Sequence, residues 1–317
     1  MKLVGLLTLL ILISCSVSEK EKDFSVYSGV NFDNSDSKKI PLIEAGDSRS
    51  GYGPPVKEMS QFETLASKKV VAFFFYPASF SSLSYLKVVD NLRKYKIHPS
   101  VYSGAGFGAV IAALLAKGLT PDHIEWKFFS LIDKLKGKKY LSIDWKEEFH
   151  LFLKKEFQSL RIEGVKHALV LPVYDKKMGK IRYLSRGNLY NTLVLNFEMN
   201  ISGNKLFYSP LVVGNLQIDK LMNKGVDKIA VINSLGSKIN FYETNHYLIG
   251  LYSKLIGFSL RESIKKNENK LWINLSLKNR EIDRANNIQN LFQSTINLNK
   301  EKIDELKQFI KKESKIK

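Results

Sequence analysis

The chain contains 317 residues, of which 44% are hydrophobic and 25% are charged, and its formal net charge is +18. This length suits one large α/β domain with extensions or two small domains, and the apolar content is too high for an intrinsically disordered protein. One cysteine excludes a disulfide framework and a cysteine-based zinc site, and five scattered histidines argue against a histidine-rich metal site. The positive charge favours an acidic partner or an anionic surface.

The amino terminus has the pattern of a secretory signal. Lys2 precedes an apolar run from Leu3 to Ile13, which is too short to span a membrane permanently. The following Leu12-Ile13-Ser14-Cys15 resembles a bacterial lipobox, which implies that residues 1–14 are a lipoprotein signal peptide and that Cys15 carries the lipid. By the same resemblance, Ser16 favours the outer membrane. The alternative is an ordinary cleaved signal in which the cysteine is incidental.

Residues 15–67 are predicted to be a flexible tether. They are rich in Gly, Ser, Asn and Asp, include Pro54-Pro55, and show little apolar periodicity. From residue 16 they carry six Lys/Arg against nine Asp/Glu, so the positive charge of the chain belongs to the body that follows.

The first half of the body predicts alternating strands and helices. Short apolar or β-branched runs predict strands over 69–76 and 99–103. Leu83 to Tyr95 has apolar residues at helical spacing, and Ala109 to Lys117 is a strongly apolar helix that ends at Gly118. The next helix is expected to begin at Thr120-Pro121, with Thr120 as its N-cap.

Further buried strands are predicted at 168–173 and 228–233. This alternation is typical of a three-layer α/β/α domain with a mostly parallel sheet. We place the domain at 68–260 and a strand and helix extension at 261–317.

The segment Ser103 to Pro121 resembles the patatin-like phospholipase family around its nucleophile elbow. Strand, Gly104-Ala105-Gly106-Phe107-Gly108 and apolar helix follow the G-x-S-x-G arrangement. The frame glycines, Gly104 and Gly108, are present. The resemblance assigns the nucleophilic serine to position 106, where this chain has glycine.

Weaker likenesses follow in the same order. Val173 to Gly179 resembles the family's A-T-D-x-x-T-G strand and turn, and Gly187-Asn188-Leu189 its G-x-L. Asn215 to Asp219 and Gly225 to Val231 resemble the segment that bears the catalytic aspartate, which the resemblance places at Ser209. Asp175 and Asp219 match framework positions. The family usually ends near a strand and helix like those of 271–292, so the resemblance implies that this stretch completes the domain.

The glycine-rich oxyanion loop of the family would fall on Phe74 to Ser79, where no glycine remains. The segment contains Phe74, Phe75, Tyr76 and Pro77. Proline has no backbone donor, and the bulky side chains crowd the approach that glycine permits. The nucleophile, the acid and the loop therefore all differ from the family pattern.

These differences predict a pseudoenzyme with no catalytic residue, which acts at an envelope membrane by binding lipid or a partner, or as a scaffold. It would use either the old acyl cleft or the basic surface. A second hypothesis is an active acyl hydrolase whose nucleophile is Ser103 or Ser209. A third hypothesis is a purely structural lipoprotein. A lipid binder should keep a cleft beside Gly106. In a structural protein, Phe74, Phe75 or Phe107 is expected to fill it.

No cofactor, metal ion or nucleic acid is expected. The third glycine of Gly104, Gly106 and Gly108 is misplaced for a dinucleotide motif and no Walker lysine follows, although the turn could bind an anion. His98, His123, His150, His167 and His246 show no metal-ligand spacing. The partners expected are the membrane, through Cys15, and anionic lipid or envelope proteins.

The terminal segment Lys300 to Lys312 has Ile303, Leu306 and Ile310 at helical spacing, with Asn299 as a possible N-cap. It is interpreted as a helix that packs its apolar stripe on the body. The alternative is an interfacial helix on anionic lipid.

Overall fold

The computed structural model describes residues 69–139, 142–198, 205–235, 247–263, 268–275 and 300–311. The predicted signal peptide, Cys15 and the tether lie outside the described residues, as do Asn299, His246 and most of 271–292.

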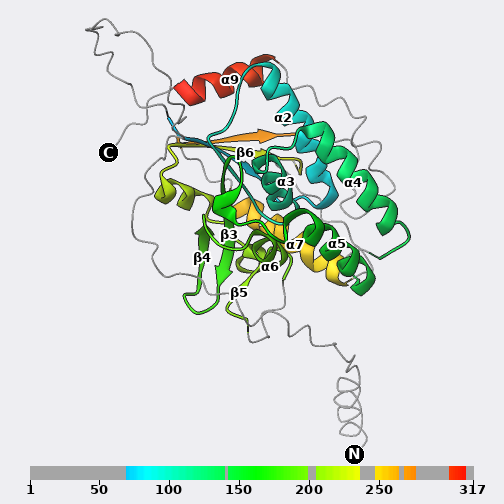
Figure 1. Cartoon of the computed structure of the whole chain (residues 1–317). Coiled ribbons are helices and arrows are strands. Elements are labelled where there is room, and N and C mark those ends of the chain that lie inside the picture. The colour runs from blue at the N-terminus through cyan, green and yellow to red at the C-terminus, as the bar shows by residue number, and fades with distance from the viewer. Residues whose placement is uncertain are drawn as a thin grey trace, which may run out of the picture. The chain divides into compact units, whose positions relative to one another are not determined.

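A seven-stranded sheet forms the centre of the described fold, in the order β4-β3-β2-β1-β6-β7, with β5 paired to β3 (Figure 1). Pairing is parallel between β3, β2, β1, β6 and β7, and β4 and β5 run antiparallel to β3. The predicted mostly parallel sheet is thus confirmed. The strands are β1 (Val71–Phe75), β2 (Val101–Gly104), β3 (Ala168–Asp175), β4 (Lys180–Leu184), β5 (Phe207–Tyr208), β6 (Lys228–Asn233) and β7 (Lys270–Asn274).

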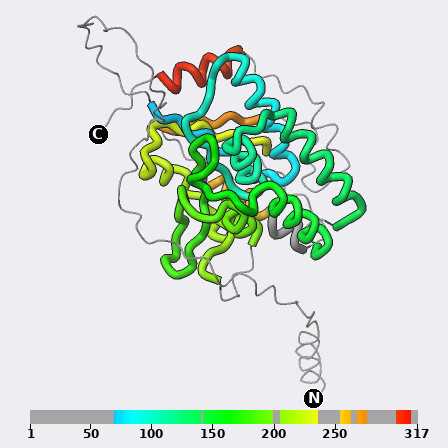
Figure 2. Tube along the Cα trace, in the orientation of Figure 1, coloured from blue at the N-terminus to red at the C-terminus, as the bar shows by residue number. Residues whose placement is uncertain are grey.

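Helices cover both faces of this sheet, as the tube in Figure 2 also shows. From β1, the strands β2 and β3 follow one another toward one edge of the sheet, whereas β7 follows β6 toward the other edge. Because crossovers between parallel strands are right-handed, the helices that connect these two sets of strands lie on opposite faces of the sheet. The three-layer α/β/α architecture is therefore confirmed. The helices are α2 (Tyr85–Lys94), α3 (Phe107–Ala116), α4 (Pro121–Leu135), α5 (Ile143–Phe157), α6 (Leu189–Leu195), α7 (Tyr247–Ser263) and α9 (Lys300–Lys311).

The predicted strands and helices agree with the structure to within two residues at each end. Every residue of β1 and β6 is buried, as their continuous apolar runs predicted. Thr120 caps α4 by accepting a hydrogen bond from the His123 N–H, and Pro121 occupies the first helical position. Helix α2 begins at Tyr85 because a 3-10 segment, Ser79–Ser84, precedes it.

Helix α9 packs against the body, as the first interpretation of the terminal segment expected. Ile303 and Leu306 are buried, and Lys228 lies over the ring of Phe309 at 5.2 Å. Strand β7 belongs to the main sheet, and α7 continues across residue 260, where the sequence analysis ended the main domain. Within the described ranges, no helix has the length and apolarity needed to cross a membrane.

Candidate active site

The turn between β2 and α3 has the geometry of a nucleophile elbow. Gly106 precedes α3 with φ 53° and ψ −128°, a strained conformation that L-residues rarely adopt. Its carbonyl accepts from the Ala109 N–H at 3.0 Å, and the Ala105 N–H bonds to the Phe75 carbonyl at 3.3 Å. Position 106 therefore stands at the sharp strand-to-helix turn that such an elbow requires.

Gly104 and Gly108 let the helix approach the sheet closely. A Cβ at Gly108 would lie 2.1 Å from the carbonyl oxygen of Phe75, and a Cβ at Gly104 would lie 2.5 Å from that of Gly108. Both contacts are with backbone, which cannot move aside cheaply. These two glycines are steric requirements of the turn, so their presence preserves the elbow frame without requiring a nucleophile.

The residue that binds the backbone of position 106 is Asn196, which the sequence analysis did not identify. Its Oδ1 accepts from the Gly106 N–H at 3.2 Å, and its Nδ2 donates to the carbonyls of Pro172 at 3.2 Å and Thr192 at 3.1 Å. Asn196 is fully buried at the end of α6. No sequence motif identifies Asn196, because its role depends on the contact between α6 and the elbow in the folded protein.

Ser209, at the position assigned to the catalytic acid, is bonded to the same residue. Its Oγ donates to the Asn196 carbonyl at 2.8 Å and accepts from the Leu211 N–H at 3.4 Å, and its own N–H donates to the Glu198 carbonyl. Ser209 is fully buried and begins the short turn Pro210–Val213. The structure thus brings positions 106 and 209 together through Asn196, and its bonds at 209 are those of a turn-capping serine.

Residues 74–79, at the position of the oxyanion loop, are buried, and the backbone N–H groups of Tyr76 and Ala78 donate hydrogen bonds within the fold. The Tyr76 N–H donates to the Ile232 carbonyl at 3.0 Å, Pro77 has no N–H, and the Ala78 N–H donates to Ser82 Oγ at 3.1 Å. None of these three residues offers a free N–H to a developing oxyanion. Phe74 and Phe75 lie within β1 and are fully buried.

This segment is held by Tyr85. The Tyr85 hydroxyl donates to the Tyr76 carbonyl at 2.8 Å and accepts from Ser234. Burial raises the pKa of Tyr85 to about 12, although the hydrogen bonds from Ser234 oppose that shift. Ser79 then has φ 50°, so the chain still turns there in a conformation that favours glycine.

A cluster of aromatic rings surrounds Phe107, the residue that follows the elbow. Its ring centroid lies 5.0 Å from Phe80, 5.2 Å from Phe149, 5.4 Å from Phe197 and 6.2 Å from Trp145. Phe107, Phe80, Trp145 and Phe149 are almost wholly buried. The space next to the elbow is therefore occupied by side chains. The hypothesis of a purely structural lipoprotein expected Phe107 to fill this space.

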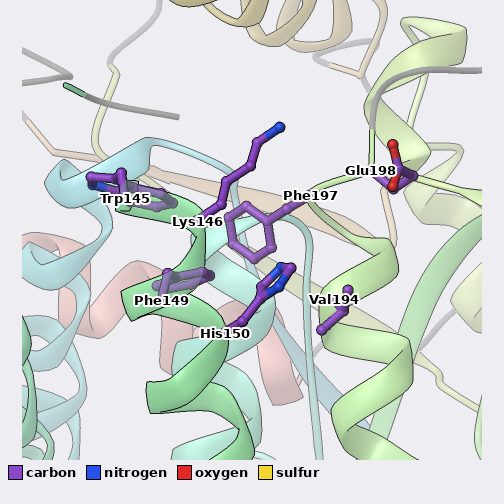
Figure 3. Close-up of a pocket in the computed structure, with 7 residues that line it drawn as sticks. All are labelled: Trp145, Lys146, Phe149, His150, Val194, Phe197 and Glu198. Atoms are coloured by element: carbon purple, nitrogen blue, oxygen red, sulfur yellow. The ribbon is translucent and has the colours of Figure 1, made fainter. Parts of the chain in front are cut away.

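A small cavity of about 60 Å³ lies on the outer side of this cluster, between α5 and the end of α6 (Figure 3). Ligand pockets commonly measure about 300–1,000 Å³, so this one is too small for an acyl chain. Burial, reinforced by Lys146, lowers the pKa of His150 and favours its neutral form. Among the residues that the structure describes, the cavity is lined by side chains other than serine, threonine and cysteine: Trp145, Lys146, Phe149, His150, Val194, Phe197 and Glu198.

Ser103, the other candidate nucleophile, lies within β2. It is fully buried, and among the described residues its Oγ has no hydrogen-bond partner. A serine is activated by an adjacent base, and the described contacts supply none. His98, His123 and His167 are exposed, whereas His150 lines the small cavity.

The framework aspartates form structural contacts. Asp175 is buried, accepts from the Met178 N–H at 3.0 Å and pairs with Arg182 at 3.3 Å. Asp219 pairs with the buried Lys270 at 3.1 Å. Across the described parts of the chain, no three His, Cys, Asp or Glu residues gather as a metal site would require.

The family model described as Patatin-like phospholipase matches residues 78–200, which include the elbow, α3 to α6 and Asn196. No curated protein matches the chain. The resemblance to the patatin-like phospholipase family, which the sequence shows around the elbow, is therefore confirmed over residues 78–200.

Proposed function

We propose that this protein is a patatin-like domain without hydrolase activity, anchored to an envelope membrane, where it acts as a binding or scaffolding protein. The observation that carries the proposal is the arrangement at Asn196. Both positions that the family resemblance assigns to the Ser-Asp dyad are bonded to this residue, and neither supplies its part of the dyad. Gly106 has no side chain to acylate, and Ser209 has no carboxylate to take up a proton.

The segment at the oxyanion position, residues 76–78, also supports the loss of hydrolase activity. Removal of one oxyanion donor from a hydrolase costs about 3–4 kcal/mol of transition-state stabilisation. Here Tyr76 and Ala78 use their N–H groups within the fold, and Pro77 has none. A hydroxyl that attacked from Ser103 would first have to leave the sheet in which it is buried.

The filled space beside the elbow indicates where a ligand would have to bind. Phe107 and its neighbouring rings fill the space next to the elbow, and the cavity that Phe149 and Phe197 line is small. Binding is therefore expected at the surface of the domain, not inside a cleft beside Gly106. This favours a membrane-surface or partner-binding role over sequestration of an acyl chain.

Anchoring is proposed through Cys15, with the outer membrane as the destination. Cells that express the chain should incorporate radiolabelled palmitate into the wild-type protein and not into a Cys15→Ser variant. Fractionation of the same cells should place the wild-type protein in the outer membrane. Equal labelling of the two proteins, or a wild-type protein free of lipid, would overturn this part of the proposal.

Loss of hydrolysis is tested by release of fatty acid from labelled phosphatidylglycerol and phosphatidylethanolamine vesicles. We expect no turnover above that of buffer, and no change in Ser103→Ala or Ser209→Ala. Turnover that disappears in one of these variants, while circular dichroism shows that variant to be folded, would establish the alternative of a relocated nucleophile.

A further inference from the structure

Two neighbouring loops form an exposed projection that the elbow does not explain. The turn between β3 and β4 consists of Lys176, Lys177, Met178 and Gly179, and Lys180 follows as the first residue of β4. Lys205-Leu206 lies beside this turn. The Lys176 N–H donates to the Leu206 carbonyl at 2.9 Å, which joins the two loops. We refer to residues 176–180 and 205–206 as the basic tip.

The basic tip projects past the carboxyl ends of the parallel strands, where the elbow also lies. Val170 is opposite Ser103, and β3 continues from there to Asp175, which adds about 16 Å of strand. Figure 1 shows β3, β4 and β5 extending away from α9, with the turns at their far end.

Its composition combines exposed apolar side chains with positive charge. Met178 is 54% exposed and Leu206 is 60% exposed, and the four lysines beside them are also exposed. The basic tip itself contains no acidic residue. Lys220 lies close by, because its Nζ donates to the Ile181 carbonyl at 3.3 Å. Burial lowers the pKa of Lys220, and the charge of Lys180 lowers it further.

Two carboxylates beside the basic tip form ion pairs, and one of these pairs involves a lysine of the tip itself. Asp175 is buried and bonded to Arg182 and to the Met178 N–H, so it holds the turn in place. Glu198 pairs with Lys205 at 2.5 Å. The field presented to a partner is therefore positive.

We propose that the basic tip docks onto an anionic lipid bilayer, with Met178 and Leu206 entering the headgroup region and the lysines facing lipid phosphates. Apolar side chains surrounded by lysine suit an anionic membrane interface, where burial of apolar surface and attraction to lipid charge add together. The hairpin is already ordered by Asp175, so little ordering entropy opposes docking. This inference deepens the proposed function and rests on its membrane anchoring.

The test uses the full chain, purified in detergent and reconstituted into vesicles. Cys15 is the only cysteine, so a lipidated Met178→Cys protein offers a single thiol for an environment-sensitive maleimide dye. In vesicles that contain phosphatidylglycerol, dye emission should shift to the blue and be quenched by brominated lipid. In phosphatidylcholine vesicles it should resemble emission in water.

A matched control lies near the amino ends of the parallel strands, where Tyr95 is 46% exposed between Lys94 and Lys96. A dye on Tyr95→Cys should remain in water in both kinds of vesicle. Lys177→Gln together with Lys180→Gln should lower the ratio of docked to undocked protein about 25-fold, at about fivefold per lysine. The corresponding Lys94→Gln and Lys96→Gln changes should leave that ratio unaltered.

The outcomes separate the two proposals. Emission at 178 that stays aqueous on phosphatidylglycerol, or that matches emission at 95, would overturn docking even if the protein is lipidated. Reaction of the maleimide with Cys15 of the wild-type protein would instead overturn lipidation. Docking would then be measured on a Cys15→Ser background, with vesicles added to the protein.

Discussion

The backbone N–H of Gly106 donates to Oδ1 of Asn196 at 3.2 Å, across 90 residues of chain. The carbonyl of the same asparagine accepts from Ser209 Oγ at 2.8 Å. One buried side chain and its backbone therefore hold together the two segments that would carry a Ser-Asp dyad. The elbow conformation is maintained by hydrogen bonds that stabilise the fold and does not depend on any catalytic group.

Replacement of Asn196 by alanine should destabilise the protein strongly. The Gly106 N–H and the carbonyls of Pro172 and Thr192 would lose their bonds to the asparagine amide in a site without water access. We expect a loss of about 2–4 kcal/mol in the free energy of unfolding, measured by urea denaturation. Gln158→Ala, at an exposed position, should change it by less than about 0.5 kcal/mol. Equal effects of the two substitutions would contradict this role of Asn196.

Gly108 should not tolerate alanine. The new Cβ would lie 2.1 Å from the Phe75 carbonyl oxygen, so α3 would have to move away from β1. A loss of about 3 kcal/mol or more is expected, seen as a lower midpoint of thermal unfolding or as failure to accumulate. Gly164→Ala is the control, because the nearest atom to its Cβ would be 4.0 Å away. A stable Gly108→Ala protein would mean that the close approach of α3 is not required.

Much of this fold could be predicted from local patterns. The strands β1 and β6 are continuous apolar runs, and α4 begins with a threonine cap and a proline at its first position, so short stretches of sequence determine these elements. The glycines at 104, 106 and 108 predicted the turn because they meet steric demands that few other residues can meet.

Other features depend on contacts distant in sequence. Helix α5 was not predicted, although Trp145, Phe149 and Leu153 are spaced for burial, because charged residues interrupt its apolar face. The aromatic cluster and Asn196 were missed for a related reason. Phe80, Phe107, Phe149 and Phe197 come from four separate segments, and only the tertiary fold brings them together.

Glu156 should contribute stability that depends on pH. Its carboxylate is buried and pairs with Lys127 at 2.6 Å and Lys117 at 3.1 Å. Burial alone would raise the pKa of Glu156, but the hydrogen bonds and charges of the two lysines outweigh burial and lower it below its ordinary value of 4.5. The stabilisation is therefore present above pH 4.5 and is lost as the pH falls through the lower folded pKa.

Glu156→Gln should accordingly cost about 1–3 kcal/mol at neutral pH, because two half-exposed lysines would lose their counter-charge. The difference from the wild-type protein should shrink as urea denaturation is repeated in acid. Glu148→Gln, which removes a half-exposed pair with Lys138 at 3.5 Å, should cost less than about 1 kcal/mol. A Glu156→Gln effect that grows in acid would contradict the lowered pKa.

Ser103→Ala should leave stability unchanged or raise it by up to about 1 kcal/mol. Among the described residues the Ser103 hydroxyl has no hydrogen-bond partner, so alanine would relieve a buried polar group. Ser84→Ala is the matched control, because that buried hydroxyl donates to the Ser81 carbonyl at 2.6 Å and its loss should cost about 1 kcal/mol. A large loss of stability in Ser103→Ala would reveal a partner for this hydroxyl.

The central claim, that this patatin-like domain holds no activated serine, is tested most directly by reaction of the intact, folded protein with a fluorophosphonate probe. Such a probe phosphonylates a nucleophilic serine without requiring the substrate to be known. The account predicts no stoichiometric labelling under conditions in which an authentic serine hydrolase is fully labelled. Stoichiometric labelling that peptide mass spectrometry maps to one serine, such as Ser103 or Ser209, and that its alanine variant abolishes, would contradict it.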